Sequence, residues 1–312
     1  MNPFFSVVIP LYNKENYIEA TLNSVLNQTF QDFEVVIVND GSTDKGVEIV
    51  SSFHDDRIRL INQKNQGASA ARNKGIILSA GQFIALLDGD DLWYKNHLNE
   101  LLFLTKKFPN AGLFCNNYEI VLENGFIRKT KFNFKHNDNS LIVTNYFDAS
   151  LIDPVAWTSA VCFSRNDYLD LGGFDLKLLS GQDTDLWIRF ALSFKVAFNP
   201  KITACYNNHI ENSLSKNDLN TIRKNIFNKY KQIEKTNPQL KKYLDIIRYS
   251  LAISSILKND MVLFNELKKN IVLSNLNIKQ KLLLSLPRPM LSCLFRIQKK
   301  LISYNIYITA YK

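Results

Sequence analysis

A cluster of carboxylates in the N-terminal half is the first group of residues that could do chemistry. Asp88, Asp90 and Asp91 fall within four residues, directly after the apolar run Phe83–Leu87. Carboxylate oxygens at this spacing can share one Mg²⁺ or Mn²⁺, while substrate phosphate oxygens fill other positions around the cation. The pattern therefore indicates a divalent cation that binds a nucleotide diphosphate. A solvated turn with helix-capping acids is the alternative, because a DxD pattern is short and frequent.

Four further motifs accompany the acidic cluster. They are Val7–Asn13, Val36–Asp44, Asn65–Gly75 and Gln182–Trp187. Together with Asp88–Asp91, in this order and spacing, they resemble the family 2 glycosyltransferases of the GT-A fold. Five motifs in one order are a specific signature, and the resemblance covers residues 4–215.

The resemblance implies a set of nucleotide-binding residues. They are Pro10, Tyr12, Asp40, Asn65, Arg72 and Asp88. In such a set the Pro10–Tyr12 turn and Asp40 hold the nucleoside, Arg72 lies on the diphosphate side, and Asp88 lies nearer the ribose. From the residues alone, Asp40 also fits an Asp-Gly turn, and Arg72 also fits a cation on a helix surface.

The same resemblance implies the metal ligands. Asp90 is the implied principal ligand of Mn²⁺ or Mg²⁺, and Asp91 supports the ligand from behind, without contacting the metal, or caps a helix. His209 lies in a segment similar to the histidine–serine segment that closes the site in the family, where it would touch the metal or the diphosphate. A structural or surface histidine is the alternative for His209.

Asp183 resembles the catalytic base of the family. A general base takes the proton from the acceptor hydroxyl as that oxygen attacks the anomeric carbon, and the metal offsets the charge on the departing nucleotide. The implied reaction is a single displacement that inverts the anomeric configuration. Asp185 is the alternative base, or the N-cap of the helix that follows. Gln182 stands where the family usually has Glu, which puts in doubt any role that needs a charge there.

These residues must be positioned by an α/β fold. Apolar β-rich runs alternate with helix-period stretches through the first ninety residues, which is typical of a mostly parallel central sheet flanked by helices. The expected strands are Phe5–Pro10, Glu34–Val38, Arg57–Ile61 and Phe83–Leu87, and the expected helices are Tyr17–Gln28, Asp44–Phe53, Ala68–Ser79 and Leu92–Lys106. The turns with Asp40, Asn65 and Asp88 each follow a strand, so we expect them to meet in one crevice.

The later chain divides into a mixed part and a helical part. Residues 112–165 indicate mixed strands and a polar loop or hairpin, Lys129–Ser140, near the acceptor side. A helix is expected from Gln182 to about Ser193, followed by two short strands. Helical repeats of Leu, Ile and Lys begin after Ser215, so we expect a GT-A catalytic domain over 1–215 and a helical C-terminal region over 216–312.

Composition excludes several other classes. The 312 residues are 46% hydrophobic and 21% charged, near globular averages, which excludes fibrous and disordered chains. Four scattered cysteines show no CxxC spacing, so we expect neither a zinc site nor a disulfide framework. The start of the chain lacks a signal-peptide pattern, and no window approaches the ~18–20 apolar residues of a membrane span. We therefore expect a cytoplasmic protein.

The net charge of +9 is concentrated at the end of the chain. From Leu267 onward there are nine Lys or Arg and no acid, whereas residues 1–266 carry equal numbers of basic and acidic residues. Apolar side chains alternate with these cations, and Pro287 and Pro289 divide the segment into two short helices. The pattern favours binding of this segment to an anionic membrane surface, on the inner face of the membrane. Amphipathic helices that pack on the catalytic domain, with solvated lysines, are the alternative. Nucleic acid is not expected, because few aromatic residues accompany the charges.

The predicted function is the transfer of a single sugar from a nucleotide-diphosphate sugar. UDP is preferred because it dominates the family, and the acceptor is a hydroxyl of a glycan or lipid-linked acceptor in surface polysaccharide biosynthesis. The sequence contains neither the GxGxxG spacing of dinucleotide-binding dehydrogenases nor the GxxxxGK[ST] spacing of P-loop ATPases, which argues against both classes. The QxxRW segment of processive synthases is also absent, which favours single transfer. A non-catalytic nucleotide-sugar-binding or scaffold protein with this fold is the alternative.

Overall fold

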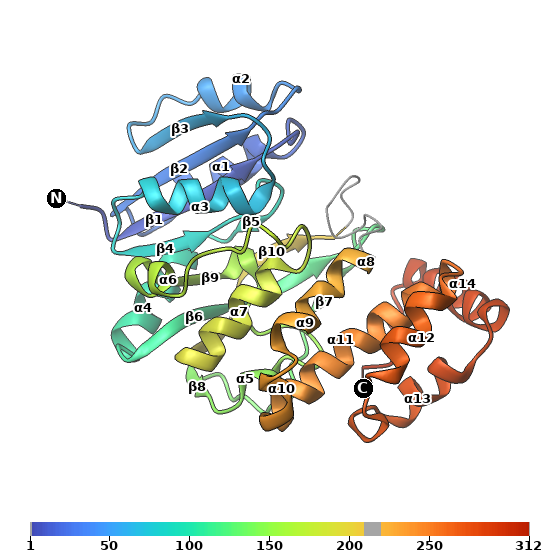
Figure 1. Cartoon of the computed structure of the whole chain (residues 1–312). Helices are drawn as coiled ribbons and strands as arrows, with labels where there is room; N and C mark the ends of the chain where they lie inside the picture. Colours follow the sequence, from blue (N-terminus) through green and yellow to red (C-terminus); the bar gives the residue numbers. More distant parts are fainter. Residues whose placement is uncertain (1, 209–219, 312) are drawn as a thin grey trace.

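The computed structural model describes residues 2–208 and 220–311, and its described part is built on one mixed sheet (Figure 1). The sheet runs in the order β3-β2-β1-β4-β9-β6-β10-β5, with β7 paired to β6 and β8 paired to β10. The strands are β1 (Phe5–Leu11), β2 (Phe33–Asp40), β3 (Ile58–Gln63), β4 (Phe83–Leu86), β5 (Leu92–Trp93), β6 (Ala111–Val121), β7 (Ile127–Lys129), β8 (Leu141–Val143), β9 (Val161–Ser164) and β10 (Lys195–Asn207). The α/β class is therefore confirmed.

Helices cover both faces of this sheet. The N-terminal helices are α1 (Ile18–Leu26), α2 (Gly46–Ser51), α3 (Ala68–Leu78), α4 (His97–Lys107), α5 (Tyr146–Ala149), α6 (Arg165–Asp170) and α7 (Gln182–Ser193). Buried side chains of α1, α2 and α4 form one apolar core with the sheet, and those of α3 and α7 belong to a second core on the other face. β1, β2 and β4 are therefore buried along most of their length, as their near-continuous apolar sequences require, whereas β3 at the edge of the sheet is partly exposed.

The parallel half of the sheet confirms the predicted alternation of strands and helices. β1 pairs in parallel with β2 and β4, and β2 pairs in parallel with β3. The helix α3 lies unusually close to this half, since a Cβ atom on Gly75 would lie 2.5 Å from the Cγ1 of Val8. The absence of a side chain at Gly75 therefore lets the helix that carries Arg72 pack close against β1.

Beyond β4 the sheet is mixed rather than mostly parallel. β9 pairs antiparallel with both β4 and β6, β7 pairs antiparallel with β6, and β5 and β8 pair antiparallel with β10. Only the β6–β10 pairing of this half is parallel among the described residues. Apart from β6 and β7, these antiparallel neighbours are far apart in the chain, so their pairing is decided by tertiary packing and not by a short connecting turn.

Two predicted elements were wrong in their bounds. Leu92 and Trp93 form β5 instead of the first turn of a helix, because they pair with Ala204 and Cys205 and the Trp93 indole donates a 2.6 Å hydrogen bond to the Ser159 carbonyl. The helix α4 starts only at His97. The two short strands expected after α7 are one long strand, β10, with irregular register near its middle. In each case contacts distant in sequence override the local pattern.

The chain from Asn220 onward is helical throughout its regular elements. These are α8 (Asn220–Arg223), α9 (Asn225–Tyr230), α10 (Ile233–Thr236), α11 (Pro238–Leu257), α12 (Met261–Lys269), α13 (Ile278–Ser285) and α14 (Arg288–Ser303), with a short 3₁₀ turn at Leu273–Asn275. The predicted break at the prolines is confirmed, since α13 ends before Pro287 and Pro289 lies in the first turn of α14. None of the described helices is long and apolar enough to span a membrane.

The helical region shares a core with the sheet. Leu240 and Leu244 of α11 are fully buried in the same apolar cluster as Trp187 and Phe198. The far helices behave differently: Leu291 is the single buried residue of α14. In Figure 1, α3, β2 and β3 form one end of the molecule and α12–α14 the other. The C-terminal region is thus anchored by α11, while α14 remains largely open to solvent.

One buried histidine ties α4 to β10. His97 is fully buried, its ring stacks on Trp93 at 4.2 Å, and its Nδ1 lies 2.8 Å from the Thr203 Oγ1. Burial lowers the pKa of His97 to about 3, from a usual value of 6.5. The folded protein therefore keeps this ring neutral at pH values at which the unfolded chain binds a proton.

We expect His97 to make folding stability depend on pH. Between pH 6.5 and about 4.5 the unfolded state binds up to one more proton at this position than the folded state. The free energy of unfolding should therefore decrease as the pH is lowered, by up to about 1.4 kcal/mol per pH unit. In His97→Gln this contribution disappears. Urea unfolding of both proteins across this range measures the slopes. Equal slopes would show that His97 titrates normally in the folded state.

Candidate functional site

The three acids after β4 take up different positions. Asp88 forms an ion pair with Arg72, and the Asp90 Oδ2 lies 2.5 Å from the Lys14 Nζ. Asp91 is fully buried and points away from these pairs; it accepts hydrogen bonds from the Ser159 hydroxyl (2.6 Å) and from the backbone N–H of Asn207 (3.1 Å). Asp88 and Asp90 are thus available to a ligand, and Asp91 fixes the loop.

Burial and mutual repulsion affect the acids of this loop. Burial raises the pKa of Asp91 well above its usual range, and the negative charges of Asp90 and Asp88 add to the effect. Burial also raises the pKa of Asp90, with Lys14 opposing the shift and Asp88 contributing to it. A site that crowds carboxylates in this way favours a cationic partner.

Arg72 reaches the acids from α3. Its side chain is buried, which rules out the alternative of a helix-surface cation, and its guanidinium lies 5.5 Å from the centre of the Phe174 ring. Burial works to lower the pKa of Arg72, but the negative charges of Asp88 and Asp183 outweigh it and raise the pKa. The Nε–H of Arg72 is buried and has no hydrogen-bond partner among the described residues. Arg72 therefore keeps a donor for a ligand.

Asp40 organises the loop after β3. It is almost fully buried, and its two oxygens accept hydrogen bonds from the Gln63 side chain (2.7 Å) and from the backbone N–H groups of Gln66 and Gly67 (both 2.8 Å). The Asp-Gly turn is also present, since Gly41 has a φ of 75° and a Cβ there would lie 2.9 Å from the backbone nitrogen of Asn65. A carboxylate can accept up to about four hydrogen bonds, so these three contacts leave one acceptor position of Asp40 unused.

The turns predicted to meet do lie together. The Asp40 turn contacts Asn65, the loop with Asn65 leads into the helix that carries Arg72, and Arg72 pairs with Asp88. Pro10 joins them through its carbonyl oxygen, which would lie 3.3 Å from a Cβ on Gly89.

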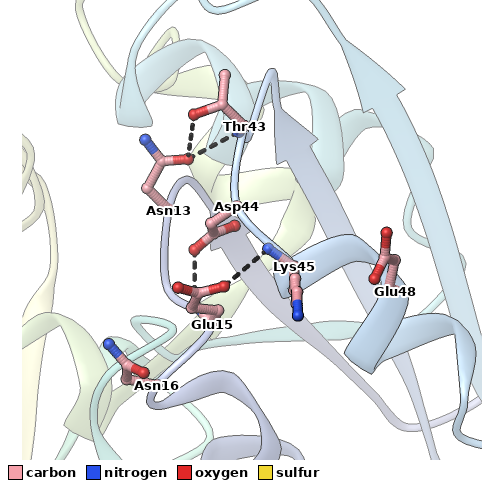
Figure 2. Close-up of a pocket in the computed structure, with 7 residues that line it drawn as sticks. All are labelled: Asn13, Glu15, Asn16, Thr43, Asp44, Lys45 and Glu48. Carbon is pink, nitrogen blue, oxygen red and sulfur yellow. Dashed lines mark hydrogen bonds between the residues drawn. The ribbon is translucent and has the colours of Figure 1, made fainter.

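Tyr12 is half exposed just beyond β1. The loop that follows it is hydrogen-bonded to the loop after β2, and a hollow of about 580 Å³ lies between them (Figure 2). The Asn13 Oδ1 accepts a 2.8 Å hydrogen bond from the Thr43 N–H, the Asp44 Oδ2 accepts one of 2.7 Å from the Glu15 N–H, and the Glu15 Oε2 accepts one of 3.0 Å from the Lys45 N–H. These hydrogen bonds fix the loop that begins just after Tyr12. None of the predicted nucleotide-binding residues is among the residues that line the hollow.

The first turn of α7 carries both candidate bases. Gly181 precedes the helix with a φ of 79°, a left-handed conformation that glycine adopts without strain. Asp183 is partly exposed, and its Oδ1 accepts a 2.7 Å hydrogen bond from the Thr184 N–H. Its negative charge contributes to the raised pKa of Arg72. Asp183 is therefore a carboxylate that is partly open to solvent and whose charge acts on Arg72.

Asp185 is placed for a structural role. It is fully buried; its Oδ2 accepts hydrogen bonds from the Arg189 Nη2 (2.7 Å) and Nε (2.9 Å), and its Oδ1 accepts one from the Tyr230 hydroxyl (2.7 Å) and pairs with the Lys229 Nζ (2.8 Å). Both oxygens are occupied, and none faces solvent. A general base must reach its substrate, so the geometry favours Asp183 over Asp185.

Removal of the buried Asp185 carboxylate should lower the stability of the fold, in addition to any effect on activity. Asp185→Ala removes the buried carboxylate that Arg189 and Lys229 share, and we expect the free energy of unfolding to fall by about 3–5 kcal/mol. Lys229 keeps its ion pair with Asp175, so the loss comes mainly from Arg189 and Tyr230. The matched variant is Asp183→Ala, two residues away and partly exposed, for which we expect a loss below about 1 kcal/mol. Urea unfolding monitored by circular dichroism compares them. Similar losses for both would contradict the structural role of Asp185.

Some site residues were not identified from the sequence. Lys14 directly follows the first motif, two residues after Tyr12, and that position was the signal that could have identified it. Ser159 and Asn207 hold Asp91 from distant segments, and no sequence pattern indicates them. His209 lies outside the described residues. Among residues 2–208 and 220–311 no group of three or more His, Cys, Asp or Glu side chains could hold a metal by itself.

Comparison with known proteins agrees with this arrangement. Residues 6–166, slightly more than half of the chain, match the family described as glycosyl transferase family 2. An uncharacterized glycosyltransferase of Rickettsia bellii is 32% identical over 200 residues, which cover 62% of this chain and 28% of that protein. Escherichia coli WfgD, named as a UDP-Glc:alpha-D-GlcNAc-diphosphoundecaprenol beta-1,3-glucosyltransferase, is 34% identical over 160 residues, which cover 49% of this chain and 63% of WfgD.

The solved structures share the fold. S. aureus TarS, residues 1–349 in complex with UDP-GlcNAc, superposes with a TM-score of 0.61 at 18% identity over 86% of this chain and 91% of that one. This likeness shows the GT-A fold. The aligned region spans only about a third of the Rickettsia relatives. Because the family model matches residues 6–166, more than half of its length, the chain belongs to glycosyl transferase family 2.

Proposed function

We propose that this protein transfers a single sugar from a UDP-sugar to an acceptor hydroxyl, with inversion of the anomeric configuration. The observation that carries the proposal is the ion pair of Arg72 with Asp88, a buried guanidinium with a spare donor beside an acid of the metal motif. The accessible carboxylate of Asp183 acts electrostatically on the same guanidinium. A cation for the diphosphate and a base for the acceptor are the two groups that such a displacement needs.

The donor assignment is supported by relatives. WfgD is named for a UDP-sugar, and TarS was solved with UDP-GlcNAc and with UDP. In this chain Tyr12 would lie against the base, Asp40 would accept a hydrogen bond from it, and the Nε–H of Arg72 would donate to the diphosphate. The acceptor is a glycan or lipid-linked acceptor in surface polysaccharide biosynthesis, for which the diphosphoundecaprenol in the name of WfgD gives support.

A divalent cation, Mn²⁺ or Mg²⁺, fits the donor set. Asp88 and Asp90 offer oxygen ligands two residues apart, and hard cations commonly take one or two carboxylates plus substrate phosphates. When bound, the cation would supply charge neutralisation for the leaving diphosphate. For that role Lys14 must release Asp90, while Asp183 takes the acceptor proton. His209 remains a further proposed contact to the metal or the diphosphate.

The test is a nucleotide-release assay with purified protein. UDP-, GDP- and dTDP-sugars are incubated with Mn²⁺, with and without a lipid-diphosphate acceptor. We expect release of UDP from one UDP-sugar, stimulated by the acceptor, and an inverted product by NMR. Tight binding of a nucleotide sugar without release from any donor would favour the alternative of a non-catalytic binding protein.

We further propose that the protein works at the inner face of the membrane. Residues 267–312 carry nine cations and no acid, and several apolar side chains of α13 and α14 are exposed, among them Leu282 and Met290. Apolar groups entering the lipid boundary beside cations would give peripheral binding. Co-sedimentation with phosphatidylglycerol vesicles, but not with phosphatidylcholine vesicles, is the expected result, and the double variant Lys299→Glu/Lys300→Glu should weaken it.

A further inference from the structure

A groove separate from the candidate active site opens in the helical region. It lies between α11, α13, α14 and residues 307–311, and its volume is about 620 Å³. Sites for small molecules have volumes of about 300–1,000 Å³. Its walls are mainly apolar, with Ile253 and Leu257 from α11, Leu283 from α13, and Leu294 and Leu301 from α14.

Several apolar side chains of the groove are open to water. Leu282 is 59% exposed, Leu294 43%, Ile297 50% and Ile308 53%. All four line the same hollow, so they form one patch rather than scattered surface residues. A continuous exposed patch of this kind marks a site that is covered by a partner or ligand.

The charged residue among those that line the groove is a lysine, Lys279. The whole stretch 267–312 contains no Asp or Glu. The nearest acid recorded for a cation of α14 comes from another part of the chain: the Lys299 Nζ lies 3.5 Å from Glu123, with both side chains largely exposed. An apolar hollow with a cationic rim complements a molecule that joins a hydrocarbon chain to an anionic group.

We infer that this groove binds a hydrocarbon chain of one membrane lipid that has a phosphate headgroup. The chain lies against Ile253, Leu283 and Leu301, and the phosphate meets Lys279. A second copy of this protein is a poorer occupant, because it would bring the same acid-free surface against itself and like charges would repel. The inference rests on the membrane contact proposed above and does not depend on sugar transfer.

The binding test uses the full chain and soluble short-chain lipids. Dioctanoyl phosphatidylglycerol, kept below its micelle concentration, is titrated in a calorimeter. Glycerol phosphate serves as the headgroup without chains, and dioctanoyl phosphatidylcholine serves as the chain with a zwitterionic head. We expect one-to-one binding of the phosphatidylglycerol, at least tenfold weaker binding of the phosphatidylcholine, and no binding of glycerol phosphate.

Variants locate the site. Leu294→Trp fills the groove and Lys279→Glu reverses the charge at its edge, and each should weaken lipid binding at least tenfold. The matched controls are Val262→Trp and Lys269→Glu, exposed residues of α12 that do not line the groove; both should bind as the unmodified chain does. Circular dichroism confirms that all four variants are folded.

Three results would overturn the inference. They are unchanged lipid binding by Leu294→Trp, equal binding of glycerol phosphate, and a concentration-dependent dimer that Leu294→Trp abolishes. Retained sedimentation with phosphatidylglycerol vesicles together with no binding of the short-chain lipid would refute the groove while leaving the membrane proposal intact. Transfer to a water-soluble acceptor by Leu294→Trp is expected to be unchanged, so failure of the groove and failure of the enzymatic proposal are separable.

Discussion

Asp183→Asn is expected to lower the rate of sugar transfer by about 10²–10⁴-fold, the usual contribution of a general base. The amide has nearly the shape of the carboxylate, and its oxygen can still accept the hydrogen bond from the Thr184 N–H, so the start of α7 should be preserved. Donor affinity should change little, because the base acts on the acceptor. Turnover and calorimetric donor binding must therefore be measured separately.

The control for this prediction is Asp185→Asn. Its carboxylate is enclosed by Arg189, Lys229 and Tyr230, so we expect lower stability to accompany any loss of transfer. A folded Asp185→Asn protein that loses more activity than Asp183→Asn would reverse the assignment of the base. A product that retains the anomeric configuration would contradict the single displacement itself.

Asp90→Ala is expected to reduce transfer to background and to weaken Mn²⁺ binding, which electron paramagnetic resonance measures independently of turnover. The fold should survive, because the carboxylate is partnered by Lys14, whose side chain is partly exposed and can turn to water. Charge neutralisation at the leaving diphosphate is a large part of the barrier reduction in such reactions.

The matched variant is Lys14→Met. It frees the Asp90 carboxylate and should bind Mn²⁺ more tightly than the unmodified chain, even if transfer is slower. Full turnover by the unmodified protein in excess chelator would refute the metal assignment, and equal Mn²⁺ affinity in Asp90→Ala would refute Asp90 as a ligand.

The parallel half of the fold could be predicted because its signals are local. The runs at β1, β2 and β4 are near-continuous apolar segments, and polar turns follow β2 and β4 directly, so strand ends and site residues coincide in the sequence. The insertion of β9 between β4 and β6 has no such signal. It is decided by pairing between segments about 50 to 80 residues apart, which a periodicity does not encode.

The two candidate bases also show the difference between what local sequence indicates and what distant contacts decide, within one turn of a helix. Spacing placed Asp183 and Asp185 together, and nothing local distinguishes them. The difference comes from Tyr230, which lies 45 residues further along the chain and donates to the Asp185 Oδ1. Burial of Asp185 is therefore a property of tertiary packing, and only the folded chain separates an enclosed carboxylate from an accessible one.

The pairing of Lys14 with Asp90 and of Arg72 with Asp88 has a consequence for how a donor approaches. The charges within these two ion pairs cancel, so before the cation binds the pairs exert little long-range attraction on a diphosphate. Association of the donor should then depend only weakly on ionic strength. Recognition must come at short range: Lys14 moves from Asp90 to a phosphate oxygen, while Arg72 stays paired with Asp88 and donates its free Nε–H. A molecule without a phosphate would leave the Lys14–Asp90 pair intact.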